Sequence, residues 1–266
     1  MGAKNTYRRS RASGPTVWAQ LMYSDTLIAP SFFKVSGKGV CMGVGEANKA
    51  GSLLQVLRRG VCAGVLIAVG GCVFLLCENR YVASGLFSVA LVCILYREYI
   101  LFTGQVGFFI QRRSRTEAVS LLIGLFANLA SVWLLGVWMR YAAGAVAQAA
   151  EALCTAKLSA SAFTVFTRGF FCGVLMDCAV RLYREKNTML GVLLCVPVFL
   201  VCGFEHSVAD FFYFAAARCY TAQMLWFMLL VLLGNSAGAL LLPCLTYQKT
   251  KQNLKMLKFV LLYHHS

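Results

Sequence analysis

Residues 192–214 read VLLCVPVFLVCGFEHSVADFFYF, an apolar stretch interrupted by a glycine, a glutamate, a histidine and an aspartate. A helix that crosses a bilayer core needs about 20 apolar residues. The stretch is long enough, but Gly203, Glu205, His206 and Asp210 fall part way along it. Irregular backbone at membrane depth is tolerated only where protein buries it or where it lines a wet cavity. The stretch therefore predicts a membrane span that is broken near its middle.

The whole chain has the composition of a membrane protein. Of its 266 residues, 59% are hydrophobic and 13% are charged, and the mean hydropathy is +0.70, well beyond what a soluble core requires. A net charge of +15 would suggest nucleic acid in a soluble protein, but most Lys and Arg residues lie in the termini and in two short loops. We therefore expect a multi-pass protein of the lipid bilayer, with no nucleic-acid partner.

Six segments are long and apolar enough to span a membrane once interruptions are allowed. Nineteen Lys and Arg residues fall on one side of these segments and four on the other, so the positive-inside rule places both termini in the cytoplasm. We expect a cytoplasmic N-terminal region at 1–59, partly disordered or amphipathic, a transmembrane domain at 60–246 and a cytoplasmic tail at 247–266 that forms a separate short amphipathic helix. The predicted spans are 60–77, 82–110, 117–139, 161–180, 189–215 and 222–246.

Internal repetition indicates an inverted arrangement. The motif RGVCAGVL at 59–66 recurs as RGFFCGVL at 168–175, and LFANLA at 125–130 resembles LLGNSA at 232–237. Three spans separate the copies, so the two halves insert with opposite orientation, as in transporters built from broken helices. The second span, about 29 residues long, exceeds one straight helix and is the predicted partner of the fifth. The predicted fold is an all-α membrane protein with six transmembrane helices in an inverted 3+3 repeat.

These motifs resemble the formate/nitrite transporter family from about residue 50 onward. The resemblance rests on GFEHSVAD in the fifth span, LFTG in the second, GNSAG in the sixth and RGFFCGVL in the fourth. It implies an aquaporin-like pore in each protomer of a homopentamer and passage of small monovalent anions together with protons. Formate is the first expectation, with nitrite, hydrosulfide or lactate as others. The expected location is the bacterial inner (plasma) membrane, and no cofactor, metal or enzymatic activity is expected.

The resemblance also assigns site residues. It places the family's central histidine on His206, a facing threonine on Thr103 and a lysine before the fourth span on Lys157. Pore constrictions align with Leu91, Phe102 and Phe199. Glu205, Asp210, Asn235 and Gly173 are the expected supporting residues.

Three positions depart from the family pattern. Gly173 stands where an asparagine is usual and would remove an amide from the central chamber, Asp210 replaces an asparagine, and Ile100 replaces an acidic residue. Transfer of a small anion from water into a dry constriction costs several kcal/mol of free energy. His206 would avoid this cost by giving the anion a proton. Lys157 would concentrate anions at the outer mouth. Glu205 is expected to pair or to cap the break, and Asp210 to cap the second half-helix.

Other classes of membrane protein fit the sequence less well. An intramembrane metalloprotease would need a second histidine at helical spacing from His206. A haem-bearing or anchor subunit of a respiratory enzyme would need two axial histidines within spans, whereas His206 alone lies in one. An aquaporin-like channel for neutral solutes remains an alternative, although the paired Asn-Pro-Ala motifs are absent. The twelve cysteines lie mostly in apolar runs, where they act as small hydrophobes.

Overall fold

The computed structural model describes residues 49–263, and every regular element in that range is helical. These residues belong to one compact unit. The predictions for residues 1–48 lie outside the described residues. In chain order the elements are α2 (Lys49–Leu76), α3 (Arg80–Tyr96), α4 (Phe102–Gln105), η2 (Val106–Phe108), α5 (Phe109–Arg112), α6 (Arg115–Ala142), α7 (Gly144–Leu158), α8 (Ala162–Lys186), α9 (Leu190–Val201), α10 (Ser207–Ala217) and α11 (Ala222–Tyr263).

Four helices are long and apolar enough to cross a membrane, judged by length and composition: Ser52–Leu76, Arg115–Ala142, Ala162–Lys186 and Ala222–Thr246. The other two predicted spans are interrupted. The second divides into α3 and the short helices α4, η2 and α5, and the fifth divides into α9 and α10. Large hydrophobic side chains remain exposed along the long helices, as expected of surfaces that face lipid or another subunit.

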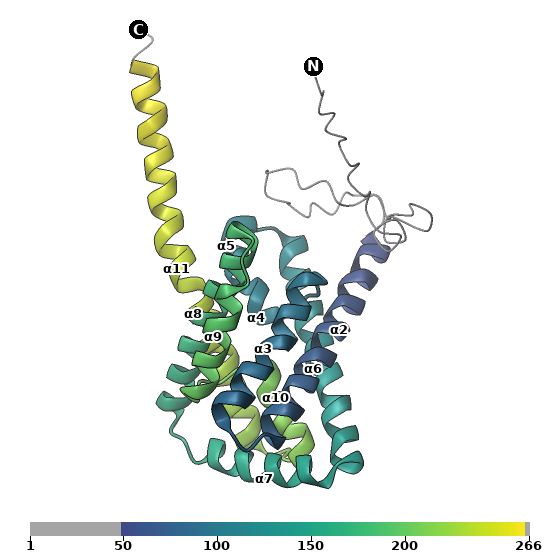
Figure 1. The fold of residues 1–266 in the computed structure, drawn as a ribbon. Helices are drawn as coiled ribbons and strands as arrows, with labels where there is room; N and C mark the ends of the chain where they lie inside the picture. Colours follow the sequence, from purple (N-terminus) through teal and green to yellow (C-terminus); the bar gives the residue numbers. More distant parts are fainter. Residues whose placement is uncertain (1–48, 264–266) are drawn as a thin grey trace, which may run out of the picture. The chain divides into compact units, whose positions relative to one another are not determined.

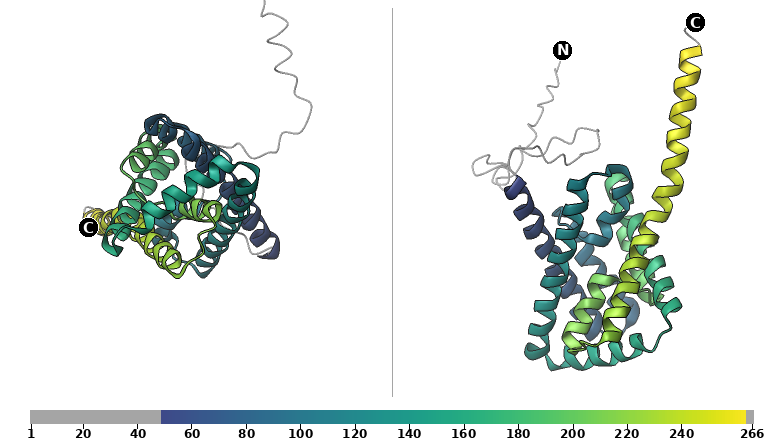
Figure 2. Two further views of the ribbon diagram at one scale, coloured as in Figure 1. Left: turned by 90° about the horizontal axis from the view of Figure 1, so that it is seen from below. Right: turned by 180° about the vertical axis from the view of Figure 1, so that it is seen from behind.

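Two features were not predicted. A helix of 15 residues, α7, fills the connection that the sequence suggested was a loop, and Figure 1 shows it lying across one end of the bundle. The last helix, α11, continues without interruption from the sixth span to Tyr263, so the predicted tail is a prolongation of that span. The view from behind in Figure 2 shows this prolongation beyond the bundle.

Local capping sets where several helices begin. The side chain of Asn79 accepts hydrogen bonds from the backbone at the start of α3. Ser114 accepts from the N–H of Glu117 at 3.1 Å, the pattern of a capping box at the start of α6. Ser161 accepts from the N–H of Thr164 at the start of α8. These caps satisfy orphan N–H groups, and they separate the long helices from their connections.

The break in the second span is held by one asparagine of α6. The side-chain amide of Asn128 donates to the carbonyl of Gly60 at 2.8 Å and to the carbonyl of Ile100 at 2.9 Å. Its oxygen accepts from the N–H of Phe102 at 2.8 Å. Interrupting a helix frees backbone groups that are costly when buried without a partner. Asn128 therefore satisfies the backbone on both sides of the break and ties it to α2.

The break in the fifth span has the same construction. Asn235 of α11 donates to the carbonyls of Gly169 and Glu205, each at 2.8 Å. It accepts from the N–H of Ser207 at 2.9 Å. Asn128 and Asn235 occupy equivalent places in the repeated motifs LFANLA and LLGNSA. The repeat in the sequence thus corresponds to a repeat in hydrogen bonding.

Backbone contacts extend this correspondence. The N–H of Ile100 reaches the carbonyl of Arg59 at 3.3 Å, and the N–H of Glu205 reaches the carbonyl of Arg168 at 3.4 Å. Arg59 and Arg168 begin the two copies of the RG motif. In Figure 1, α2 runs toward the end where α7 lies, whereas α8 runs away from it. These observations support the predicted inversion of the two halves.

The helix before each break ends in the same kind of turn. Glu98 after α3 and Gly203 after α9 have positive φ angles of 52° and 69°. In each case the N–H of the following residue bonds back to the carbonyl five positions earlier, at 2.8 Å and 2.9 Å, as in a Schellman motif. Glycine suits this conformation. Glu98 adopts it with support from Arg59, which hydrogen-bonds the Glu98 carbonyl and lies 3.2 Å from its carboxylate.

Replacing Asn235 tests whether the amide holds the fifth span in its broken form. Asn235→Leu removes three buried hydrogen bonds, and each buried group left unpaired costs roughly 1–3 kcal/mol. We expect a large loss of folded protein and a lower melting temperature in detergent. Ser236→Ala is the control, because that hydroxyl bonds only to Leu232 of its own helix among the described residues. Equal melting temperatures for the two variants would contradict this role of Asn235.

Candidate functional site

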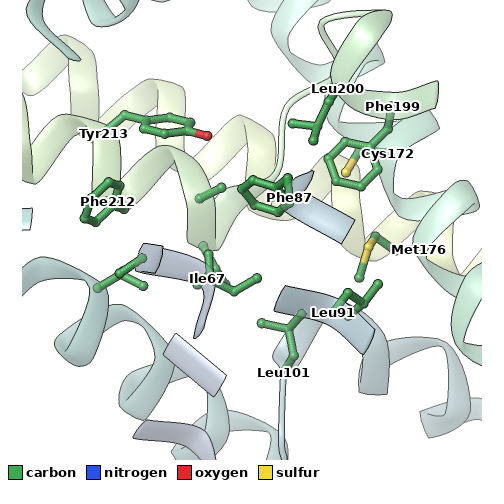
Figure 3. Packing of buried hydrophobic residues seen from close by; sticks show 14 of the residues in the cluster. Ile67, Phe87, Leu91, Leu101, Cys172, Met176, Phe199, Leu200, Phe212 and Tyr213 are labelled. Carbon is green, nitrogen blue, oxygen red and sulfur yellow. The ribbon is translucent and has the colours of Figure 1, made fainter. Parts of the chain in front are cut away.

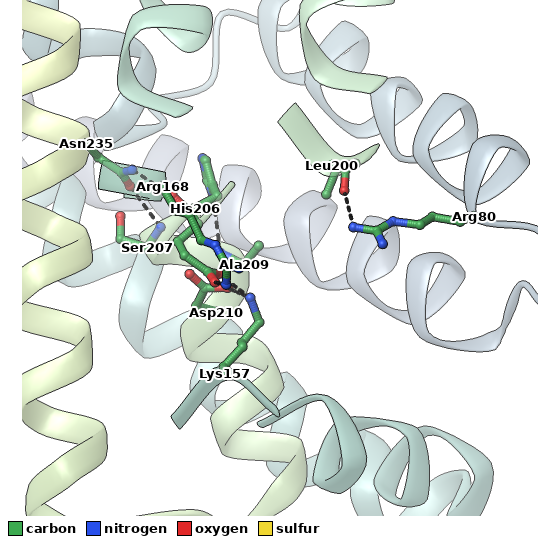
Figure 4. A network of polar contacts seen from close by, with 10 residues as sticks. Arg80, Lys157, Arg168, Leu200, His206, Ser207, Ala209, Asp210 and Asn235 are labelled. Atoms are coloured by element: carbon green, nitrogen blue, oxygen red, sulfur yellow. Dashed lines mark hydrogen bonds and ion pairs between the residues drawn. The ribbon is translucent and has the colours of Figure 1, made fainter. Parts of the chain in front are cut away.

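A hydrogen-bonded pair joins the two broken spans. Thr103 Oγ1 of α4 lies 2.8 Å from His206 Nε2, and both residues are buried. His206 is also the N-cap of α10, because its Nδ1 accepts the N–H of Ala209 at 3.2 Å. Figure 4 shows the ring beside the start of α10. The sequence predicted that His206 and Thr103 face one another, and the structure brings them together.

These two bonds fix which ring nitrogen of His206 carries hydrogen. Nδ1 accepts an amide N–H, so it presents its lone pair to Ala209. In a neutral imidazole the other nitrogen then carries the proton, and Nε2–H donates to the hydroxyl oxygen of Thr103. A second proton on Nδ1 would displace the cap of α10. The cap therefore favours a neutral His206 with its donor directed toward Thr103.

Apolar side chains surround this pair. The ring of Phe199 stacks on the His206 ring, with centroids 5.9 Å apart and an interplanar angle of 16°. Leu91 and Phe199 are buried in the same hydrophobic cluster, and Figure 3 shows them near Cys172 and Met176. Phe102 lies in a different cluster, with Val106 and Ala239. The structure thus groups two of the three predicted constriction residues with each other and packs Phe102 elsewhere.

The repeat register differs from the sequence interpretation. The sequence interpretation treated Thr103, the residue expected to face His206, as its counterpart in the other half. The hydrogen bonds of the two asparagines instead pair Phe102 with Ser207, so the position equivalent to His206 is Leu101. Thr103 reaches His206 from two residues further along. The polar pair therefore breaks the symmetry of the repeat, which sequence spacing alone did not reveal.

A buried ionic cluster adjoins His206. Lys157 Nζ of α7 is 2.9 Å from Asp210 Oδ1 and is hydrogen-bonded to Glu205 Oε2. The Glu205 and Asp210 side chains are 2% exposed, and Lys157 is 12% exposed. Burial by itself would lower the pKa of Lys157, but Asp210 and Glu205 outweigh burial and raise its pKa above the ordinary value. Lys157 lies in α7, outside the candidate spans.

This cluster changes two expectations and agrees with a third. Lys157 was expected to concentrate anions, but two carboxylates offset its charge. Asp210 was expected to cap α10, but the cap is His206 and Asp210 pairs with Lys157. Glu205 was expected to pair or to cap, and it pairs with Lys157, with Arg168 3.7 Å from its other oxygen.

Gly173 lies at a helix contact. A Cβ at this position would come within 2.1 Å of the Asn235 carbonyl oxygen, so the missing side chain lets α8 approach the backbone of α11. Small residues commonly permit such close helix packing in membranes. The sequence interpretation, an amide lost from a central chamber, does not fit this position. Gly173 instead supports the placement of Asn235.

A second polar region lies at the opposite end of the bundle, where α5 lies. A cavity of about 120 Å³ there is lined by Arg59, Glu98, Ile100, Arg112, Glu117 and Arg184, among others. Arg59 pairs with Glu98, and Arg112 lies 3.7 Å from Glu117. Arg184 stacks over the Phe108 ring at 4.6 Å. Within the described part of the chain, no carboxylate lies within ion-pair distance of Arg184.

Sequence reasoning missed this cavity because its members come from distant parts of the chain. It also missed the ion pair in which Asp177 accepts from Arg181 at 2.8 Å and 3.0 Å. The i, i+4 spacing of Asp177 and Arg181 was the signal that could have identified that pair. Ile100, noted as a departure from the family pattern, lines the cavity.

The four helices long and apolar enough to cross a membrane, together with the two interrupted spans, are those of a multi-pass helical membrane protein. The sequence model of the formate/nitrite transporter family matches residues 39–248 of the chain. The chain belongs to the formate/nitrite transporter family.

Solved structures show the same fold. One similar structure is an ion channel of the FNT family, with 21% identity, a TM-score of 0.65, and coverage of 76% of this chain and 91% of that chain. Another is a pentameric formate channel with formate bound, with 17% identity, a TM-score of 0.64, and coverage of 77% and 100%. A search of curated proteins finds no match.

Two substitutions of His206 test its role as the N-cap of α10 separately from its contact with Thr103. Asparagine is a good N-cap whereas alanine is not, and losing a cap costs typically about 1 kcal/mol. We expect His206→Ala to lower the melting temperature in detergent and His206→Asn to stay close to the unaltered protein. Equal losses for both variants would show that the Nδ1 bond to Ala209 does not stabilise α10.

Proposed function

We propose that this protein is a membrane channel for small monovalent weak-acid anions. Formate is the first candidate, and nitrite, hydrosulfide and lactate are further ones. The observation that carries the proposal is the buried Thr103–His206 pair, which sits where the two broken spans meet. The family membership and the formate bound to one structural neighbour support the choice of anion.

The pair offers what a small anion needs in an apolar passage. Transfer of an anion from water into such surroundings costs several kcal/mol without compensating hydrogen bonds. The hydroxyl of Thr103 and the Nε2–H of His206 are donors that can turn from each other toward a passing oxyanion or weak acid. Phe199 and Leu91 exclude water around them. A species that becomes neutral at this point crosses at the lowest cost.

The orientation in the membrane is also part of the proposal. Basic residues gather at the α5 end of the bundle, where Arg59, Arg112 and Arg184 line one cavity. By the positive-inside rule this end faces the cytoplasm. The proposed setting is a bacterial inner membrane, with five protomers that each contain a pore. The exposed hydrophobic side chains of the long helices supply surfaces for lipid and for neighbouring protomers.

Arg184 is better placed than Lys157 to attract anions. Its positive charge has no carboxylate partner within the described residues, and it borders the cavity at the α5 end. A positive group in a low-dielectric mouth raises the local concentration of anions. Lys157, in contrast, is held between Glu205 and Asp210.

Flux in proteoliposomes tests the proposed function. We expect pH-dependent uptake of formate, and a smaller response to at least one of nitrite, hydrosulfide and lactate. Thr103→Val removes a donor worth roughly 1 kcal/mol, and His206→Asn replaces the Nε2–H with the amide donor of a shorter side chain that stops short of Thr103, so each should slow formate flux about fivefold. Ser88→Ala is the control, because its hydroxyl bonds to Ser84 of its own helix.

Three outcomes oppose different parts of the proposal. Absence of flux for every weak-acid anion tested, in correctly folded and inserted protein, would exclude the function. Flux of glycerol or another neutral solute without flux of formate would favour the neutral-solute channel. Unchanged formate flux in both site variants would leave the channel but exclude Thr103 and His206 from its path.

Arg184→Gln tests anion capture at the α5 end. Removal of this charge should raise the formate concentration needed for half-maximal flux severalfold at low salt, with little change in the maximal rate. Salt should reduce the difference, because ions screen the attraction. Lys186→Gln removes the same charge two residues along, at a position that does not line the cavity, and serves as the control. An equal effect of the two substitutions would point to general surface charge and not to Arg184.

A further inference from the structure

We propose that Asp210, together with Lys157 and Glu205, forms a proton-binding site, and that this site supplies the proton with which a weak-acid anion crosses. The inference rests on the proposed function and names a residue for its proton step. It replaces the hypothesis that the His206 ring gives the proton.

The first observation is an imbalance of buried charge. The cation of the cluster, Lys157, is 12% exposed and contacts two carboxylates, those of Glu205 and Asp210, that are both 2% exposed. Arg168 lies 3.7 Å from Glu205, but its side chain is 41% exposed and so contributes less. Two carboxylates that share a buried site resist full ionisation. An uncompensated buried charge is costly, so the cluster favours keeping one proton.

The second observation is an unpartnered oxygen. Lys157 contacts Asp210 Oδ1, whereas Asp210 Oδ2 is buried without a hydrogen-bond partner among the described residues. The hydroxyls of Tyr213 and Ser207 are also buried without a hydrogen-bond partner among the described residues. A bare carboxylate oxygen in this state is unfavourable. A proton on Oδ2 turns that oxygen into a donor, which can serve a water or an anion.

The third observation concerns position. Asp210 is one helical turn beyond His206 on α10, and the Asp210 N–H bonds to the His206 carbonyl at 2.9 Å. Residues four apart lie on the same helix face. The cluster therefore adjoins the Thr103–His206 pair. Figure 4 shows Asp210 and Lys157 next to His206.

His206 itself is a poorer proton store. Its Nδ1 is occupied by the N–H of Ala209, and its Nε2 is bonded to Thr103. A further proton would have to displace the cap of α10. A proton on Asp210 displaces nothing.

Other titratable groups surround the cluster. Those on neighbouring elements are thiols, and α10 itself adds a phenol; both kinds of group are neutral in the ordinary pH range. The groups around it are Cys154 of α7, Cys172 of α8, Cys72 of α2, and Tyr213 and His206 of α10. The imbalance therefore remains one cation against two carboxylates, with the exposed Arg168 beyond them.

The proton step balances without another reactant. The O–H bond of the Asp210 carboxylic acid breaks, and an O–H bond forms on the anion, which becomes the neutral acid. Asp210 is left as a carboxylate beside Lys157. A proton from solution restores it by way of the Lys157 side, which is 12% exposed. The neutral acid releases its proton to water on the other side, so anion and proton move together.

Infrared spectroscopy in lipid bilayers tests the proton site without relying on transport. We expect a C=O band of a protonated, buried carboxyl group near neutral pH. The band should disappear in Asp210→Asn and persist in Asp177→Asn. Asp177 is the control, because it is buried against Arg181, whose second carboxylate partner, Glu185, is 56% exposed and so needs no proton to offset burial. Lys157→Gln should strengthen the band, since both carboxylates then lose their cation, and it serves as the second variant if Asp210→Asn does not fold.

Flux measured together with proton uptake tests the role in transport. In the unaltered protein, protons should enter with formate at a ratio near one. Asp210→Asn should lower formate flux at least about tenfold, since a positioned general acid typically contributes that much or more, and should flatten its dependence on pH.

The outcomes separate the two proposals. A carboxyl band that survives Asp210→Asn unchanged, or flux and coupling that do not change in this variant, would overturn the proton site. A titrating band in a protein that passes no weak-acid anion would uphold the proton site and reject the transport function.

Discussion

The structure depends on two buried asparagine side chains that satisfy broken backbone. A span can lose its helical hydrogen bonds inside a membrane only if other groups replace them. Asn128 and Asn235 do so with matching sets of bonds, each reaching two carbonyls and one N–H. Each asparagine also ties its break to the RG motif at the start of the same half. The small residues of those motifs allow the close approach that these bonds require.

The two breaks place polar side chains where the two halves of the molecule meet. The first places the buried Thr103 in the first turn of α4, and the second makes His206 the N-cap of α10. One imidazole thus completes a helix and also faces the hydroxyl of the other half. This double use ties the protonation state of His206 to the stability of α10. The Lys157–Asp210 contact of the adjoining cluster caps no helix. In our proposal this cluster can therefore exchange a proton without loss of a cap.

Sequence patterns predicted the interrupted spans and the residues at their breaks, because polar residues inside apolar runs are conspicuous. They predicted neither α7, whose small, mixed residues carry no strong periodicity, nor the continuation of α11 to Tyr263. The ion pair of Lys157 with Asp210 was not predicted either, because these residues meet only after α7 folds across the bundle. The partner of His206 in the repeat, Leu101, emerged only from the hydrogen bonds of the two asparagines. Gly173 required the packing of α8 on α11 to be understood.

The protonation of the His206 ring is the most direct measure of this account. Nitrogen-15 NMR of histidine-labelled protein in lipid bilayers reports it, after His264 and His265 are replaced so that one histidine remains. We predict one protonated and one unprotonated ring nitrogen, with Nε2 carrying the hydrogen, throughout about pH 6 to 8, where a free histidine would titrate. A doubly protonated ring near neutral pH, or hydrogen on Nδ1, would contradict the cap at Ala209 and the assignment of the proton to Asp210.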